Sequence, residues 1–385
     1  MSRCLSVLDI GNELYAMSLS YTVIWIDIVE GMKHFQETKE KRKMKSKLVA
    51  LAMSLLAVVG CQDDKQKLYV YTWADYIDPE IIAKFEDEND CKVIIDTFDS
   101  NENMFAKLVM GAKGYDVIMP TEYVMPLLTN ANLIEELDIT KLQNVVKSFD
   151  HKFDSEWSLK WDVPYAFSCT GIIWRKDKCP PELTFQDWND LFDPRLHGRV
   201  CMMDDIREVL GLSLIVNGFS VNSINEEELN KAVITARNWK RRCTKMDNEA
   251  YRTGIPSEAF YAAMSYNSDA IQLLADNSDN IGYIVPTNGT TSSIDAFCIT
   301  KSAENKELAY KFIDMFYDID NAVKNAEYNG VPMPVVGLYD ALSDKYKAIP
   351  FMRVTDELKS RCEDIKDVGD QIDLYANAWD KVKAH

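Results

Sequence analysis

Three strand-like runs between residues 68 and 119 decide the fold. They read LYVYTW at 68–73, CKVIIDTF at 91–98 and YDVIM at 115–119. Such short runs, rich in β-branched and aromatic residues, are typical of strands. A helical pattern follows each of the first two. Strands that alternate with helices in this way predict an α/β structure built around a largely parallel sheet.

The predicted helices begin at recognisable caps. Asp78-Pro79 places an N-cap Asp before a first-turn Pro. Residues 100–110 form a second helical pattern, whose apolar side holds Met104, Leu108 and Val109. Further on, the pattern predicts strands within residues 161–174 and helices at 226–242, 257–266, 305–317 and 371–383.

Composition narrows the class of protein. The chain has 385 residues, of which 47% are hydrophobic and 27% charged, as in globular proteins. Asp and Glu number 61 against 43 Lys and Arg, for a net charge of −18. No basic stripe is visible, so we expect no nucleic-acid partner. An acidic surface favours cationic ligands.

The first 61 residues contain a targeting signal. Lys45 and Lys47 precede an apolar run from residue 48 to 59, which ends in Gly60-Cys61. This run is too short to span a bilayer but has the length of a signal-peptide core. We expect residues 1–43 to be an upstream extension outside the fold, 44–60 a lipoprotein signal peptide and 61–67 a tether. Cys61 resembles the lipid-modified cysteine of a bacterial lipobox, which predicts an extracytoplasmic protein anchored to a bacterial membrane.

No enzyme signature is present. The chain lacks a GxSxG elbow, a phosphate-binding P-loop and an HExxH motif. The remaining seven cysteines are scattered and the four histidines form no cluster, so we expect no metal and no cofactor. An extracytoplasmic enzyme or a sensor domain is an alternative. The sequence shows no nucleophile–base pair for the enzyme and no signalling segment for the sensor.

Carboxylates and aromatic residues are the better candidates for a site. Asp205 and Glu208 are three residues apart, so at the start of a helix they can face the same side. The spacing also fits a capping box, in which both side chains satisfy helix-end amides. Either reading, a helix cap or a pair of carboxylates for an ammonium group, fits this segment.

Further candidates follow apolar stretches. Asp269 comes after Tyr266-Asn267-Ser268, and Asp295 lies at the expected start of a strand. A carboxylate that enters a buried strand is costly unless it is paired. Trp73, Tyr76, Tyr123 and Tyr266 supply aromatic faces. Carboxylates for charged ends and rings for methylenes are what an alkyl-ammonium ligand needs.

Three segments carry a resemblance to a known family. Residues 71–76 (YTWADY), 99–102 (DSNE) and 204–209 (DDIREV) resemble the spermidine/putrescine-binding periplasmic proteins of bacterial polyamine ABC importers. The similarity runs from about residue 68 to the C-terminus. It implies a two-lobed type II periplasmic binding protein, with a hinge and a ligand cleft between the lobes. Lobe 1 would comprise 68–169 and 294–332, and lobe 2 would comprise 170–293 and 333–385.

The resemblance also implies a site and partners. Trp73 and Tyr76 would pack against the ligand chain, with Asp75 beside them, while Asp205, Glu208, Asp269 and Asp295 would bind amino groups. Tyr266 stands in place of a family tryptophan, and Glu122 would add a further carboxylate. The ligand would be a polyamine, the partners would be permease subunits, and the protein would be a monomer.

The sequence departs from the family within the aromatic positions. Ser293, Val331 and Ile365 stand where the family has two aromatic residues and a glutamine. A different organic cation, or another small solute bound by the same fold, is therefore an alternative. An anion is disfavoured, because Arg207 lies between Asp205 and Glu208.

Overall fold

The computed structural model describes residues 65–277 and 279–384. The predicted upstream extension, signal peptide and lipidated Cys61 lie outside the described residues. Of the predicted tether, Gln66 and Lys67 already belong to the first strand, so the fold begins earlier than predicted. Nothing below concerns the residues before 65.

One mixed sheet runs through this part of the chain. Its strands follow the order β2-β1-β3-β9-β4-β7-β5-β6, with β10 beside β9 and β8 beside β4. Their bounds are β1 Gln66–Thr72, β2 Cys91–Thr97, β3 Val117–Ile118, β4 Val163–Arg175, β5 Val200–Met202, β6 Lys245–Met246, β7 Ala262–Tyr266, β8 Ile281–Ile284, β9 Thr290–Ile299 and β10 Cys362–Asp364.

The helices pack around this sheet. They are α3 Pro79–Asn89, α4 Asn101–Val109, α5 Met125–Asn130, α6 Gln143–Ser148, α7 Ile206–Val216, α8 Glu226–Lys240, α9 Ala250–Gly254, α10 Asn267–Asn277, α11 Lys306–Met315, α12 Ile319–Asn329, α13 Leu338–Ala341, α14 Asp344–Lys347, α15 Asp356–Ser360 and α16 Ile372–Lys383. Among the described residues, no helix combines the length and apolarity needed to cross a bilayer.

The predicted cap at Asp78 is confirmed, since Asp78 accepts a hydrogen bond from the Glu80 amide at the start of α3. At the start of α4, Ser100 accepts one from the Asn103 amide. Met104 and Leu108 are buried as expected, but Val109 is 55% exposed. Val109 is the last residue of its helix, where the side chain points past the core.

The sheet is mixed instead of largely parallel, which corrects the prediction. β1 is parallel to β2 and β3, β5 to β6 and β7, and β10 to β9, whereas β9 is antiparallel to β3 and β4, and β4 is antiparallel to β7 and β8. The two antiparallel strands are the long ones that cross the molecule. The helix predicted at 257–266 is also wrong, because residues 262–266 form β7, which pairs with β4 and β5.

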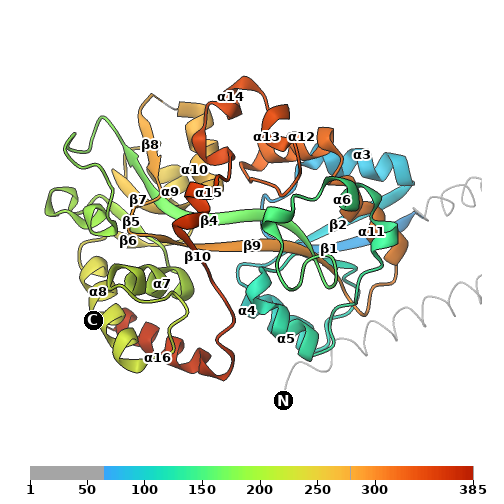
Figure 1. Cartoon of the computed structure of the whole chain (residues 1–385), viewed down its shortest axis with the longest axis horizontal. Coiled ribbons are helices and arrows are strands. Elements are labelled where there is room, and N and C mark those ends of the chain that lie inside the picture. Colours follow the sequence, from blue (N-terminus) through green and yellow to red (C-terminus); the bar gives the residue numbers. More distant parts are fainter. Residues whose placement is uncertain (1–64, 278, 385) are drawn as a thin grey trace, which may run out of the picture. The chain divides into compact units, whose positions relative to one another are not determined.

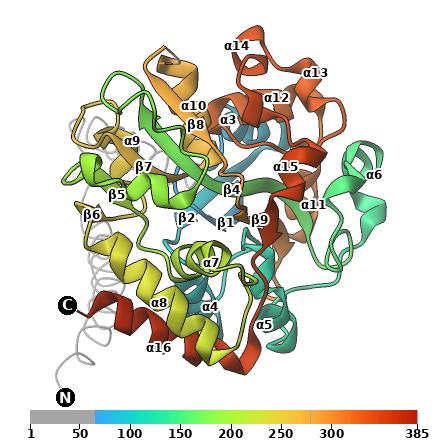
Figure 2. The same ribbon diagram turned by 60° about the vertical axis from the view of Figure 1, so that its left-hand side comes forward.

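β4 and β9 join two groups of elements, which Figure 1 shows on either side of them. Over residues 163–169, β4 pairs with β9, and from Thr170 it pairs with β7. One group holds β1, β2, α3, α4, α5, α6 and α11, and the other holds β5 to β8, α7 to α10 and α16 (Figures 1 and 2).

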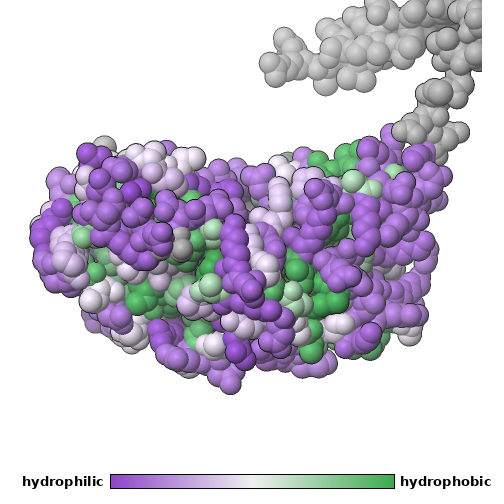
Figure 3. All heavy atoms as spheres, turned by 90° about the horizontal axis from the view of Figure 1, so that it is seen from above, coloured by the Kyte–Doolittle hydropathy of each residue, from purple (hydrophilic) through white to green (hydrophobic). Residues whose placement is uncertain are grey.

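One apolar cluster contains residues of both groups, and a further cluster lies within each. In the second group, α7, α8 and α16 bury Leu210, Leu229 and Tyr375 in a common cluster. In the first, Tyr71, Met104 and Cys298 belong to another cluster under β1 and α4. Viewed from above, hydrophilic residues cover most of the surface, with apolar residues showing between them (Figure 3).

Candidate functional site

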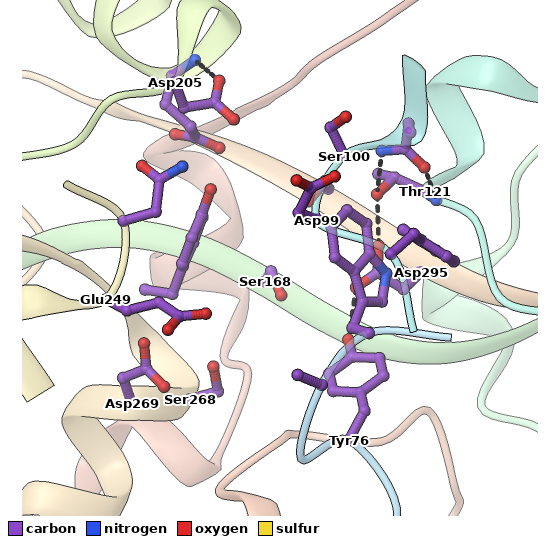
Figure 4. Close-up of a pocket in the computed structure, with 18 of the residues that line it drawn as sticks. Tyr76, Asp99, Ser100, Thr121, Ser168, Asp205, Glu249, Ser268, Asp269 and Asp295 are labelled. Carbon is purple, nitrogen blue, oxygen red and sulfur yellow. Dashed lines mark hydrogen bonds between the residues drawn. The ribbon is translucent and has the colours of Figure 1, made fainter. Parts of the chain in front are cut away.

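A cavity of about 870 Å³ lies where the two groups of elements face each other. Figure 4 shows its two walls, with Tyr76, Asp295, Thr121 and Ser100 on one side and Asp205, Glu249 and Asp269 on the other. Ser168 of β4 lies between them. A cavity of this volume suits a small molecule.

The loop after β1 builds the first wall. Trp73 packs its ring edge-on against Phe98, with centroids 4.4 Å apart, and its buried indole Nε1 has no hydrogen-bond partner among the described residues. Asp75 has a left-handed backbone conformation, with φ of 53°. Tyr76 donates a short hydrogen bond to Asp295. This loop therefore brings a ring, a carboxylate and a phenol to the cavity at the end of one strand.

Asp295 is buried within β9, not at the start of the strand as predicted. Thr121 Oγ1 donates to its Oδ1 at 2.6 Å, and Thr121 also pairs with Asp295 as an isolated bridge. Burial raises the pKa of Asp295 to about 6, although the hydrogen bonds from Thr121 and Tyr76 lower it. Both carboxylate oxygens accept hydrogen bonds from neutral groups, so an approaching ammonium would favour the ionised form.

Asp205 and Glu208 build the second wall at the start of α7. Asp205 is the N-cap, and its Oδ1 accepts from the amides of Arg207 at 2.8 Å and Glu208 at 3.0 Å. Glu208 does not complete a capping box, because its Oε2 accepts from the hydroxyls of Thr170 at 2.7 Å and Thr291 at 2.5 Å. The two readings of this segment are thus combined, with one cap and two carboxylates at the cavity.

Glu208 is buried and Asp205 half-buried. Burial raises the pKa of Asp205, and burial and the neighbouring Asp205 raise the pKa of Glu208 to about 7. Arg207 forms no ion pair with them, because its Nη1 donates to the Lys366 carbonyl and its Nη2 to Asn222, each at 2.9 Å. Its guanidinium carbon lies 4.6 Å from the centre of the Tyr375 ring, and its buried Nε has no hydrogen-bond partner among the described residues. The two terminal nitrogens of Arg207 are thus engaged in structural contacts, and the two carboxylates beside it disfavour an anion.

Tyr266 and Asp269 complete the predicted set on this wall. Tyr266 is the last residue of β7, and Asp269 lies in the first turn of α10. The Tyr251 hydroxyl donates to Asp269 at 2.5 Å. Burial raises the pKa of Asp269, while Tyr251 and Arg252 lower it.

Eight of the nine predicted ligand-binding residues line this cavity, and Glu122 does not. The eight are Trp73, Asp75, Tyr76, Asp205, Glu208, Tyr266, Asp269 and Asp295. Glu122 begins a short 3-10 helix, Glu122–Val124, directly after Thr121. Since Thr121 uses its side chain on Asp295, the next side chain points elsewhere, and Glu122 faces the fully buried Asp162.

Several lining residues went unrecognised in the sequence. Arg252, Glu249 and Gln272 line the cavity but belong to no motif. Their signal is three-dimensional, since Arg252 of α9 meets Asp269 of α10 only in the folded chain. Ser293, Val331 and Ile365, the expected departures from the family pattern, also line the cavity, and Ser293 and Val331 are smaller than aromatic residues would be.

Among the described residues, no cluster of three or more His, Cys, Asp or Glu side chains is arranged to hold a metal ion. All seven cysteines between residues 65 and 384 are free. The cavity thus offers carboxylates and rings, a combination that can bind a small organic cation.

Two groups of elements joined by β4 and β9, with a ligand-sized cavity between them, define a two-lobed solute-binding protein of the periplasmic type II class. Residues 80–354 match the family described as bacterial extracellular solute-binding protein, and the chain belongs to that family. The match confirms a solute-binding protein in place of an enzyme.

Named relatives align with most of the chain. The putrescine/cadaverine-binding protein of Pseudomonas aeruginosa is 27% identical over 350 residues, covering 88% of this chain and 99% of the relative. The spermidine/putrescine-binding periplasmic protein of Escherichia coli is 27% identical over 346 residues, covering 88% and 97%.

Solved structures agree with the fold. The Tp0655 (TpPotD) lipoprotein of Treponema pallidum is 29% identical with a TM-score of 0.74, covering 82% of this chain and 99% of that chain. The spermidine/putrescine ABC transporter substrate-binding protein PotD of Streptococcus pneumoniae is 26% identical with a TM-score of 0.70, covering 82% and 99%. The predicted family and fold class are confirmed.

Proposed function

We propose that this protein captures a polyamine or a similar organic cation outside the cytoplasm and delivers it to the permease of an ABC importer. One observation carries the proposal. Asp205, Glu208 and Asp295 face the same cavity from opposite walls, and no ion pair engages them among the described residues. The names of the relatives from P. aeruginosa and E. coli support the same ligand class.

The proposed pose follows the charges. One ammonium group binds Asp205 and Glu208, and the Tyr266 ring lies beside it. The methylene chain packs between Trp73 and Tyr76, and Asp295 binds nitrogen near the middle of the cavity. Charged hydrogen bonds of this kind are worth about 1.5–3 kcal/mol each.

Ligand binding closes two lobes in this proposal. The predicted bounds are 68–169 with 294–332 for one lobe, and 170–293 with 333–385 for the other. The amide of Val336 donates to the Ser148 carbonyl at 2.7 Å, and that of Asp150 to the Pro334 carbonyl at 3.0 Å. We therefore place the return to the second lobe at β10 instead of residue 333. Closure would create the face that a permease recognises.

The proposed location is the outer side of a bacterial membrane. The lipobox-like sequence ending at Cys61 supports a lipid anchor, and we propose a monomer on that anchor. Replacing Cys61 with Ala should release the protein from the membrane fraction, as measured by detergent phase partition. If the variant stayed in the membrane fraction, Cys61 would not be the anchor.

A different organic cation is the second candidate. Ser293, Val331 and Ile365 leave the cavity with fewer aromatic contacts than the family pattern supplies. A bulkier or more branched amine than spermidine would fill that space better, while the carboxylates would still select a cation.

Thermal unfolding with a ligand panel tests the proposal. The panel holds putrescine, cadaverine, spermidine, spermine and basic amino acids, with sulfate and maltose as controls. A ligand at 100 times its dissociation constant adds about 2.7 kcal/mol of stability. A stabilising shift with an amine alone supports the proposal. A shift with sulfate or maltose alone contradicts it.

A further inference from the structure

Arg252 places a positive charge at one end of the cavity. It belongs to α9, and its Nε lies 3.5 Å from Asp269 Oδ1, while its Nη1 lies 3.9 Å from Asp75 Oδ2. Asp75 belongs to the loop after β1 and Asp269 to α10, so the guanidinium reaches carboxylates from both walls. Their side chains are 70% and 16% exposed, and that of Arg252 is 33% exposed.

Asp269 has both oxygens engaged. Oδ2 accepts the Tyr251 hydroxyl and Oδ1 faces Arg252. This differs from the three carboxylates assigned above to the amino groups of the ligand. Asp205, Glu208 and Asp295 accept hydrogen bonds from amides or hydroxyls, and none of them forms an ion pair within the described part of the chain. At these four positions, a cation thus meets three carboxylates without a counter-ion, while Asp269 already has one.

Arg252 also belongs to the wall between two neighbouring cavities. A second cavity of about 570 Å³ adjoins the first, and both are lined by Asp247, Glu249, Arg252, Asp269 and Gln272. Gln272 is held in place, because its Nε2 donates to the Asn329 carbonyl at 2.6 Å. Of these five shared residues, Arg252 has the longest side chain and carries the positive charge.

We propose that Arg252 is a specificity-determining residue, which acts as a built-in cation at Asp269 and excludes a second ammonium group from that end of the cavity. The inference rests on the proposed function and names its ligand more closely. The protein prefers an amine whose cationic groups are satisfied by Asp205, Glu208 and Asp295. It gains little from an extra terminal ammonium directed at Asp269, because that ammonium would have to displace or approach a guanidinium.

A matched pair of ligands tests this inference by isothermal titration calorimetry. N-propylputrescine and spermidine differ only in the third, terminal ammonium group, and both can place their other two amino groups at Asp205 with Glu208 and at Asp295. In the native protein, the third ammonium should change affinity little. In Arg252→Gln, it should gain about tenfold or more in affinity, because Asp269 becomes available for a charged hydrogen bond. Affinity for N-propylputrescine should stay within about twofold.

Two further variants make the result specific. Arg195→Gln removes the same charge from a surface ion pair with Asp193 and Glu182, so it should leave the ratio of spermidine affinity to N-propylputrescine affinity unchanged. Asp269→Asn in the Arg252→Gln background should abolish the gain. A gain that survives this second substitution would show that lost wall volume, not the freed carboxylate, is responsible, and it would overturn the inference.

The outcomes also separate this inference from the proposed function. An unchanged ratio of spermidine affinity to N-propylputrescine affinity in a folded Arg252→Gln protein overturns the inference but leaves the proposed function standing, provided that amines bind. Equal loss of both ligands would mean that the ion pair is only structural, and it too overturns the inference. If the native protein and every variant bind none of these amines, both fail together.

Discussion

At the scale of single residues, Asp205 and Asp295 lie on opposite walls of the cavity. Each should be needed for cation binding, because their hydrogen-bond partners are neutral groups. We expect Asp205→Asn and Asp295→Asn each to weaken binding of the preferred amine by about 2–5 kcal/mol, measured by calorimetry. The asparagine of the first variant can still cap α7, so the loss of affinity should exceed any loss of stability.

Asp204→Asn is the matched control. It removes the neighbouring charge, but Asp204 already pairs with Lys383 and is exposed. Its effect on affinity should be small. Equal effects at positions 204 and 205 would mean that only net charge matters, and the assigned site would be wrong.

Glu122 and Asp162 raise a separate question at this scale. Asp162 is fully buried, and in the described part of the chain neither of its carboxylate oxygens has a hydrogen-bond partner, nor has Glu122 Oε1. Burial raises the pKa of Asp162 and raises that of Glu122 to about 8. The carboxylates facing Glu122 from other elements, Asp295, Asp364 and Glu156, raise its pKa further. This pair therefore holds protons that the unfolded chain would release.

The consequence is a stability that falls as pH rises. An unfolded Glu loses its proton near its ordinary pKa of 4.5, whereas folded Glu122 keeps its proton until about pH 8. Between these values the folded state binds more protons, so the free energy of unfolding decreases with pH. Glu122→Gln should flatten this decrease and make the protein more stable than the native form at pH 8, by about 1–3 kcal/mol.

Urea denaturation at pH 5 and pH 8 checks this prediction. Glu88→Gln, at an exposed position of α3, serves as control and should keep the native pH dependence. The prediction would be contradicted by parallel curves for Glu122→Gln and the native protein.

At the scale of elements, β4 decides how the two halves are connected. Near Gly171 the strand leaves β9 and pairs with β7 and β8. A Cβ at Gly171 would lie 2.4 Å from the Tyr283 hydroxyl and 2.6 Å from the Ile284 carbonyl oxygen. The second of these is backbone, so the crowding cannot be relieved by a side-chain movement alone.

Gly171→Ala should therefore destabilise the protein by about 1–3 kcal/mol, measured by chemical denaturation. Ser168→Ala lies on the same strand and adds no atoms, so its effect should stay within about 0.5 kcal/mol. Equal stability of both variants would show that β4 and β8 can separate at this point without cost.

The sequence was most informative where the signal is local. Asp78 and Asp205 were readable as caps, because capping depends on residues within one turn. The strand at 262–266 was not readable, since its small residues AAMSY become a strand only by pairing with β4 and β5. The antiparallel direction of β9 depends likewise on partners far away in the chain.

The site shows the same division. Aromatic and acidic residues at strand and helix ends, such as Trp73 and Asp205, could be chosen from type and position. The direction of the Glu122 side chain could not be predicted, because it depends on the hydrogen bond that Thr121 donates to Asp295 across the sheet. Arg252 was not recognisable either, as its contacts with Asp75 and Asp269 join segments that are distant in sequence.

At the scale of the whole molecule, net charge and the cavity act in the same direction. The chain carries a net charge of −18, and its first 60 residues contain 8 basic and 6 acidic residues, so the remainder is still more acidic. Carboxylates from both walls then concentrate this negative charge at the cavity. A negative field over the mouth of a cleft attracts cations from a distance.

We therefore expect the association rate of a polyamine to depend strongly on salt. Raising the ionic strength from about 0.01 M to about 1 M shortens the Debye length from about 30 Å to about 3 Å. The association rate constant for trivalent spermidine should fall by about tenfold or more, and that for butylamine should fall less, because steering grows with ligand charge. The dissociation rate should change little, since the buried contacts are screened less. Stopped-flow fluorescence of tryptophan, with Trp73 in the cavity, measures both rates. An equal salt dependence for the two amines would show that contacts inside the cavity, not the field of the whole molecule, set the rate of capture.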